Sequence, residues 1–386
     1  MSAQIVNQQQ ELTTICEHLK EQNRIAIDLE FDKNYYRYGF NLCLMQIYDG
    51  TDCYLIDPLS SKLTIDTIFP VLESETVEKV AFAFGEDLRL LHTIGCFPKN
   101  VYDLDYAISL LNYSPASLTN HLKNILDIET GKSSQMSNWY DRPLSQQQTQ
   151  YASEDVLYLF SLHDHLRKEA DQKKVAHWID QENRAALLED YSAVDSNGSV
   201  VKHKNKKHFS EREWHIYVRL METREQLSES LNRPSFKVIK KEIMMDIARK
   251  QNELNNWTNT RGIHRRLRND KIKKKLEKVV KQAEQEADER GLSDSESADT
   301  PLSSDERTER RRLREKVNLA KDELFNPIKE KIEEDYGKEV STFLFSNRII
   351  DEIVSDQNPN LLPYKQNLLK EYAKSLDLEL TKYLHL

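Results

Sequence analysis

The chain has 386 residues, of which 38 % are hydrophobic and 31 % are charged, and its formal net charge at pH 7 is −9. This length is enough for two or three domains, and no apolar run reaches the length of a transmembrane helix. The negative charge argues against a protein that is basic over its whole surface, but it leaves room for a local basic groove.

The first half of the chain alternates predicted strands and helices, as is typical of an α/β layer architecture. Periodicity predicts strands at residues 25–31, 40–48, 52–56, 79–84 and 101–103, and helices at 7–20, 63–74, 104–112 and 117–126, with another helix opening at Gly85. The hairpin-length gap between the second and third strands makes the expected sheet mixed.

The strand at residues 25–31 carries two acids, Asp28 and Glu30, which point to the same face because side chains alternate along a strand. Buried carboxylates are costly unless a cation neutralises them, and a pair of oxygen ligands suits Mg²⁺ or Mn²⁺. One Asp-x-Glu alone is more simply explained as a solvated or salt-bridged strand end, so a metal site needs further acids.

A later helix is predicted to follow Ser145, because Ser145 and Gln148 match an S-x-x-Q capping box. It is expected to run to about residue 168. Tyr151 and Asp155 lie four residues apart on this helix and share a face. Their spacing alone favours a solvated pair, but Asp155 lies among apolar neighbours and is therefore a second candidate for a buried carboxylate.

The rest of the chain is predicted to be helical and divided by polar segments. The expected parts are an α/β domain at 1–192, a linker at 193–208, a helical domain at 209–283, an acidic flexible linker at 284–310 and a C-terminal helical domain at 311–386. The segment from Arg261 to Lys281 holds ten Lys or Arg against two acids. Such a run is either a solvated helix face or a surface that contacts phosphates.

The acidic motifs, taken in order, are Asp28-x-Glu30, Asp87 and Tyr151-x3-Asp155, and they resemble the DEDD exonuclease superfamily in the subgroup whose third motif carries a tyrosine. The flanking sequences narrow the resemblance to ribonuclease D: LCLMQI at 42–47, LIDPL at 55–59, GEDL at 85–88, and Trp139 with RPLS at 142–145. The match covers about residues 5–170. It implies a ribonuclease H-like α/β exonuclease domain.

Residues 209–283 resemble the HRDC helical domain that follows the nuclease in that family, on the strength of LMETR at 220–224 and NRP at 232–234. The last segment, 311–386, occupies the place of a second HRDC-like bundle in the family. The resemblance therefore implies an exonuclease domain followed by one or two HRDC-like domains.

The resemblance also implies a chemistry: hydrolysis of phosphodiester bonds from the 3′ end of RNA with two divalent metal ions, Mg²⁺ or Mn²⁺. In this scheme Asp28 contacts both ions, Glu30 and Asp155 complete the shell of the first, and Asp87 holds the second. Tyr151 orients the attacking water. These five residues are the expected catalytic set.

The expected partner is RNA with a free 3′ end, such as a tRNA precursor or another structured RNA. The candidate phosphate contacts are Lys132, Arg142, Arg265, Arg266, Arg268 and Lys271. The four cysteines form no CxxC pair, and residues 1–10 lack the features of a signal peptide, so buried thiols and a cytoplasmic location are expected.

Two alternatives to this function stay open. Werner-type 3′–5′ DNA exonucleases share the four acids, and a non-catalytic nucleic-acid-binding scaffold could retain them. Within the motif, Asp103 and Asp105 compete with Asp87, because many related nucleases have an aspartate near that place. The local GEDL match favours Asp87, although Phe82 stands where the family often has a histidine.

Overall fold

The computed structural model describes residues 3–191, 201, 203–250, 253–295, 297–298, 304–355 and 361–384. The chain divides into two compact units. The first unit combines Met1–Glu30, Leu42–Ser192 and Ser303–Leu386, and the second combines Phe31–Asn41 with Ala193–Leu302. Much of the linker predicted at 193–208, namely 193–200 and 202, lies outside the described residues.

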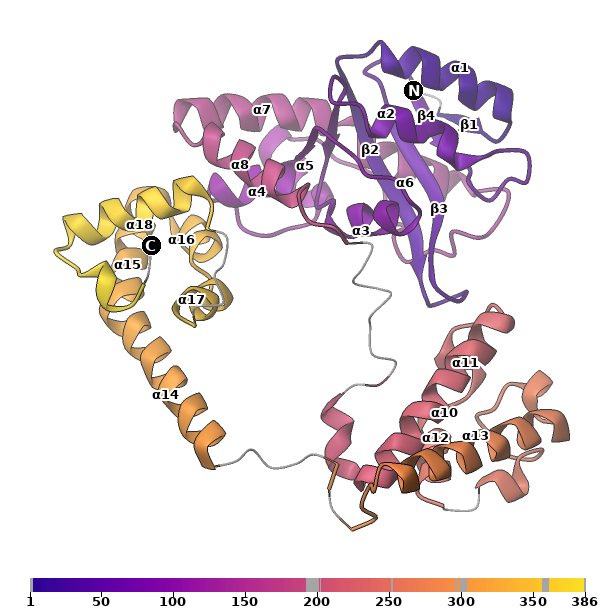
Figure 1. The fold of residues 1–386 in the computed structure, drawn as a ribbon. Helices are drawn as coiled ribbons and strands as arrows, with labels where there is room; N and C mark the ends of the chain where they lie inside the picture. The colour runs from indigo at the N-terminus through magenta and orange to yellow at the C-terminus, as the bar shows by residue number, and fades with distance from the viewer. Residues whose placement is uncertain are drawn as a thin grey trace. The chain divides into compact units, whose positions relative to one another are not determined.

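The first unit is built on a mixed sheet (Figure 1). Among the described residues, its strand order is β1-β4-β3-β2-β5-β6. The strands are β1 (Gln4–Val6), β2 (Arg24–Lys33), β3 (Phe40–Tyr48), β4 (Cys53–Ile56), β5 (Glu78–Ala81) and β6 (Val101–Asp103). Strand β3 runs antiparallel to β4, whereas β2 pairs with β5 in parallel. The mixed α/β sheet predicted from the sequence is confirmed, and β1 is an additional edge strand.

The helices before residue 192 are α1 (Gln9–Lys20), η1 (Ile65–Ile68), α2 (Phe69–Leu72), α3 (Gly85–Thr93), α4 (Leu104–Leu110), α5 (Leu118–Leu126), α6 (Gln146–Leu157), α7 (Leu159–Gln172) and α8 (Ala176–Ala186). The single helix predicted from Ser145 to about residue 168 is in fact two, α6 and α7. They meet at Tyr158, where ψ is −1° instead of the helical value of about −42°. The capping box predicted at Ser145 and Gln148 is confirmed.

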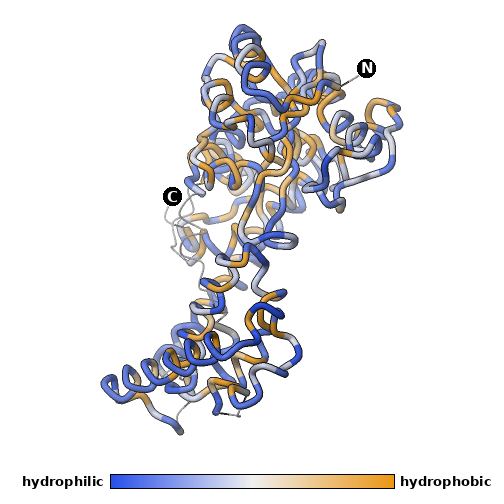
Figure 2. The backbone as a smooth tube through the Cα atoms, turned by 90° about the vertical axis from the view of Figure 1, so that its right-hand side faces the viewer, coloured by the Kyte–Doolittle hydropathy of each residue, from blue (hydrophilic) through white to orange (hydrophobic). Residues whose placement is uncertain are grey.

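Strand β2 is central in the sheet, between β3 and β5. Its residues Ile25, Ala26 and Ile27 are all buried, so both faces of the strand are covered. Hydrophobic residues, orange in Figure 2, accordingly run through the interior of this unit. A strand in this position is normally apolar throughout, and Asp28 and Glu30 are therefore exceptional in it.

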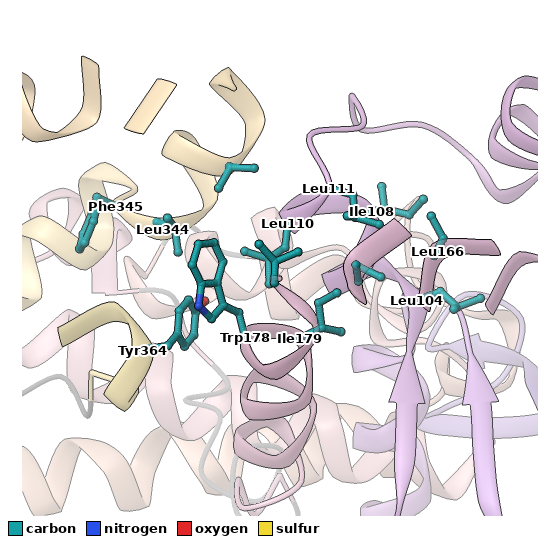
Figure 3. Close-up of a cluster of buried hydrophobic side chains, with 14 of the residues drawn as sticks. Leu104, Ile108, Leu110, Leu111, Leu166, Trp178, Ile179, Leu344, Phe345 and Tyr364 are labelled. Carbon is teal, nitrogen blue, oxygen red and sulfur yellow. The ribbon is translucent and has the colours of Figure 1, made fainter. Parts of the chain in front are cut away.

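The C-terminal helices share one hydrophobic core with the α/β domain. They are α14 (Ser304–Ala320), the π-helical turn η5 (Lys321–Phe325), α15 (Asn326–Tyr336), α16 (Lys338–Leu344), α17 (Asn347–Val354), α18 (Pro363–Ser375) and η6 (Leu380–Lys382). Helix α16 packs against α4, and the ring of Trp178 on α8 stacks on Tyr364 of α18 (Figure 3). The expected separate domain at 311–386 thus begins earlier, and it packs on the α/β domain because both bury apolar surface at their contact.

The second unit contains η2 (His203–His208), α10 (Glu211–Ser230), α11 (Ser235–Val238), α12 (Lys241–Ala248), η3 (Glu253–Asn256), η4 (Arg265–Leu267) and α13 (Asp270–Glu289). Its core surrounds Trp257, whose indole N–H donates to the carbonyl of Leu267 at 2.7 Å. Helix α13 continues past the predicted linker start at 284, because Ala283 and Ala287 stay buried on its inner face. Residues 296 and 299–303 of that predicted linker lie outside the described residues.

The four cysteines are buried thiols outside any disulfide, as the sequence predicted. None of the helices described for this chain combines the length and apolar character that crossing a membrane requires.

Candidate active site

Three acids from two elements meet at the centre of the sheet. Asp28 and Glu30 project from β2, and Asp155 projects from α6 toward them. Each offers a carboxylate oxygen, and these oxygens all lie within 4.8 Å of one another. The structure therefore brings together the first and third of the predicted motifs, which are separated by more than a hundred residues in the sequence.

The fourth acid, Asp87, lies in the first turn of α3, where the partial positive charge of a helix N-terminus favours a carboxylate. Its side chain is buried, and its Oδ1 atom has no hydrogen-bond partner among the described residues. Asp87 does not belong to the group within 4.8 Å, but its charge acts on both Asp28 and Glu30. It is therefore placed beside the cluster, as expected for a ligand of a second ion.

The electrostatics of the cluster are unfavourable without a cation. Burial raises the pKa of Asp28 well above its usual range, and the charges of Asp87 and Asp155 raise it further. Burial likewise raises the pKa of Glu30, followed by repulsion from Asp155 and Asp87. The charges that act on these two carboxyls belong to other acids, so a bound cation would relieve both the burial and the repulsion.

Tyr151 lies on α6 one turn before Asp155, so the two side chains share a face of the helix. Burial raises the pKa of the phenol above its usual value, and the charges of Asp155 and Glu30 add to the effect. The ring packs on Trp139, with the ring centroids 6.2 Å apart. The raised pKa favours the protonated phenol, which can donate a hydrogen bond.

Sequence reasoning assigned no role to Gln46 on β3, which is fully buried next to the two acids of β2. Its Nε2 atom lies 3.5 Å from both Asp28 Oδ2 and Glu30 Oε1, at the limit of a hydrogen bond. Its Oε1 atom has no partner among the described residues. A signal was present, because Gln46 is the one polar residue in the run LCLMQI at 42–47.

Both carboxylate oxygens of Asp103 accept hydrogen bonds from backbone N–H groups, whereas Oδ1 of Asp87 has no partner among the described residues. The Asp103 carboxylate accepts hydrogen bonds from the backbone N–H groups of Ala83 at 2.7 Å and Phe84 at 2.8 Å, and it also caps α4 through the N–H of Asp105. Asp105 itself is exposed. Because the oxygens of Asp103 are already engaged, the geometry favours Asp87 as the second-motif acid.

Arg142 also differs from its expected role as a phosphate contact. Its Nε and Nη2 atoms donate to the two carboxylate oxygens of Asp57, each at 2.8 Å. Nη1 donates to the carbonyls of Trp139 and Asp141, and Nη2 also donates to that of Cys43. All five N–H groups of the guanidinium are thus engaged, so this residue holds the loop before α6 and we propose no phosphate contact for it.

The other basic candidates are placed differently. Lys132 is exposed in the loop before α6. Arg265, Arg266 and Lys271 are exposed in the second unit, where Arg268 donates from Nε to the carbonyl of Ile263. The pKa of His264 is lowered by burial and then by the charges of Arg266, Arg233, Arg265 and Arg268. These charges mark a positive cluster that includes Arg233, which sequence reasoning had not singled out.

Comparisons with known proteins agree with this geometry. The family model described as 3′–5′ exonuclease matches residues 3–171, a range that contains all five predicted catalytic residues. The chain is 29 % identical over 252 residues to ribonuclease D of Bartonella henselae, covering 64 % of this chain and 61 % of that protein. It is 34 % identical over 174 residues to ribonuclease D of Zymomonas mobilis, covering 44 % of each protein.

Among solved structures, the chain is similar to RNase D of Escherichia coli, described as an exoribonuclease involved in structured RNA processing. The TM-score is 0.70 at 20 % identity, and the match covers 97 % of this chain and 99 % of that one. At this identity the likeness shows the fold, including its helical C-terminal part. In sequence, the chain spans at most about two thirds of the length of the curated relatives it matches.

Proposed function

We propose that this chain is a metal-dependent 3′–5′ exoribonuclease, because residues 3–171 match the family model described as 3′–5′ exonuclease and the resemblance to ribonuclease D is confirmed. The observation that carries the proposal is the group of Asp28, Glu30 and Asp155, with ligand oxygens within 4.8 Å of one another in the centre of the sheet. A purely structural role would not explain three mutually repelling carboxylates in a covered strand and its neighbouring helix.

The donor set fits two divalent ions of the Mg²⁺ or Mn²⁺ kind. It consists of carboxylate oxygens, which these ions prefer, and four negative charges balance two dications. The unpartnered Oδ1 atom of Asp87 is a free ligand position. Asp28 would contact both ions, Glu30 and Asp155 the first, and Asp87 the second. When bound, such ions polarise the phosphate and lower the pKa of water.

The protein groups around these acids divide the remaining tasks. The raised pKa of Tyr151 favours the protonated phenol, so its hydroxyl would donate to the attacking water and orient it toward the phosphorus atom. Gln46 would hold Asp28 and Glu30 in place from the neighbouring strand. The partly buried setting excludes much of the bulk water, which strengthens each of these interactions.

The substrate that we propose is RNA with a free 3′ end, including tRNA precursors and other structured RNA. The support is the ribonuclease D relatives and the exposed basic residues of the second unit, namely Arg265, Arg266 and the lysines of α13. Helix α13 buries Leu276 and Ala283 on one side and leaves Lys271, Lys274 and Lys278 exposed. Those side chains are available to phosphates. A cytoplasmic location also remains a prediction.

The test uses a 5′-labelled single-stranded RNA with Mg²⁺ or Mn²⁺, with chelator, and with a 3′-phosphate block. Stepwise shortening only with metal and only from an open 3′ end is expected. Absence of hydrolysis with either metal would contradict the enzymatic proposal and favour the scaffold alternative. A DNA oligomer of the same sequence, run beside the RNA, distinguishes the Werner-type alternative, which requires faster cleavage of DNA.

A further inference from the structure

Strand β6 lies at the edge of the sheet, so its outward backbone groups need partners from outside the sheet. The N–H of Asp103 at the end of β6 donates to Oδ1 of Asn183 on α8, at 2.6 Å. Asn183 is itself buried, and its Nδ2 atom donates to the carbonyl of Ile179 one turn earlier in α8. Both ends of the Asn183 amide are therefore engaged, and its orientation is determined.

Asp103 in turn determines the turn between β5 and α3. Its carboxylate accepts hydrogen bonds from the backbone N–H groups of Ala83 and Phe84. Ala83 has a φ of 53°, a conformation that L-residues rarely adopt. Helix α3 begins two residues later at Gly85, and Asp87 lies in its first turn. The start of α3, and with it the Asp87 carboxylate, is thus held by Asp103.

Helix α8 is itself fixed by the C-terminal helices. Glu182, the neighbour of Asn183, accepts hydrogen bonds from the Tyr364 hydroxyl and from Lys365 Nζ, the latter at 2.8 Å. The rings of Trp178 and Tyr364 stack with centroids 5.4 Å apart and an angle of 19° between their planes (Figure 3). All of these side chains are buried or nearly so, which makes the contact rigid.

We propose that Asn183 is a positioning residue for the second metal site, acting on Asp87 through Asp103, and that the C-terminal helices support it by holding α8. The inference rests on the proposed function in that Asp87 is taken as a metal ligand. Ligands must be held within about 0.5 Å of their productive geometry, so a shift of the β5–α3 turn weakens binding at that site first.

The experiment measures binding of Mn²⁺ to the full chain by electron paramagnetic resonance, with adenosine 5′-monophosphate present as the reaction product. The wild type is expected to bind two ions. Asn183→Leu, which keeps the volume but removes the acceptor, should weaken one of the two affinities about tenfold, as loss of outer-shell partners does. Asn183→Asp keeps an acceptor oxygen for the Asp103 N–H and should restore most of that affinity.

A matched control is Val71→Ala, which creates a cavity on α2, a helix that packs against α1 and η1. It should lower thermal stability without changing either Mn²⁺ affinity. Tyr364→Phe keeps the ring that stacks on Trp178 but removes the hydroxyl that donates to Glu182. It should lower the affinity for the same Mn²⁺ ion by a smaller factor. Because this variant leaves α8 itself intact, it tests the link even if Asn183→Leu does not fold.

The outcomes separate the two proposals. Unchanged Mn²⁺ affinities in folded Asn183→Leu, or equal weakening by Val71→Ala, would overturn the positioning role. Weakening in Asn183→Leu with none in Tyr364→Phe would overturn the support by the C-terminal helices. If Asn183→Leu does not fold, unchanged affinities in Tyr364→Phe overturn the inference. A wild-type chain that binds fewer than two ions would contradict the proposed two-ion site and, with it, the premise of this inference, whereas two ions in the wild type with unchanged variants would contradict the inference alone.

Discussion

The guanidinium of Arg142 and the carboxylate of Asp57 form two parallel hydrogen bonds, each 2.8 Å long, between residues that are 85 positions apart. Asp57 directly follows β4, and Arg142 precedes α6, the helix that carries Tyr151 and Asp155. The pair therefore joins the end of β4 to the start of α6. It is a structural connection, because planar two-point pairing of this kind fixes direction as well as distance.

Arg142→Lys should lower the free energy of unfolding by about 2 kcal/mol, the order expected for lost hydrogen bonds to a charged group. Lysine keeps the charge but cannot form the two parallel bonds or reach the three carbonyls. Urea unfolding measures the change, and Lys132→Gln, at an exposed position, is the control that should leave stability unaltered. If Arg142→Gln instead keeps full stability and reduces the salt dependence of RNA binding, the phosphate role would be restored.

Asp87→Asn should reduce the hydrolysis rate by orders of magnitude, because an amide neither balances the charge of a dication nor binds it well. Asp103→Asn should cost much less in rate. Its main effect is expected on stability, because an NH2 group replaces one of the two oxygens that accept hydrogen bonds from the N–H groups of Ala83 and Phe84. Single-turnover rates and thermal melts of both variants measure the contrast, and the opposite ranking would show that Asp103 is the second-motif acid.

Tyr151→Phe removes the hydroxyl and keeps the ring on Trp139. We expect kcat to fall about a hundredfold, within the range of groups that orient or transfer protons, with little change in KM. Mn²⁺ affinity should stay within a factor of a few, because the phenol is not a ligand in the proposed site. A large loss of Mn²⁺ binding would show that Tyr151 serves mainly to position Asp155.

The basic cluster of the second unit is tested by Arg265→Gln, Arg266→Gln and Lys271→Gln combined, leaving Arg268 because its Nε holds the Ile263 carbonyl. Glutamine removes three charges and keeps helix propensity. The slope of log affinity for single-stranded RNA against log salt should fall by about 2, or about 0.7 for each lost contact. Hydrolysis of a very short RNA should continue, since the acids all lie before residue 160.

The matched control removes the same number of charges from α14, by Arg307→Gln, Arg310→Gln and Arg312→Gln, which are exposed positions of the first unit. An equal fall in slope for both triple variants would mean that only net charge matters. An unchanged slope in the variant of Arg265, Arg266 and Lys271 would mean that the basic run from Arg261 to Lys281 is a solvated helix face.

The sequence alone determined the features that depend on local geometry. Alternation along a strand places Asp28 and Glu30 on one face, helical spacing places Tyr151 beside Asp155, and the Ser145–Gln148 capping box begins α6. The family resemblance predicted that these pieces form one site, and the structure brings Asp28, Glu30 and Asp155 together. Each of these inferences needs only the repeat of a strand or a helix, or a hydrogen bond across a few residues.

The tertiary structure alone decided which polar groups have partners. From the sequence Arg142 could be an exposed charge, yet all five N–H groups of its guanidinium donate to Asp57 and to three backbone carbonyls. Asp103 is an acid in a plausible motif position, yet its carboxylate accepts hydrogen bonds from two backbone N–H groups of the turn between β5 and α3. The link from Asn183 to Asp103, and the packing of Trp178 on Tyr364, likewise join segments far apart in the chain. Such partners are set by the packing of separate elements around a shared core, and a pattern of neighbouring residues carries no information about that packing.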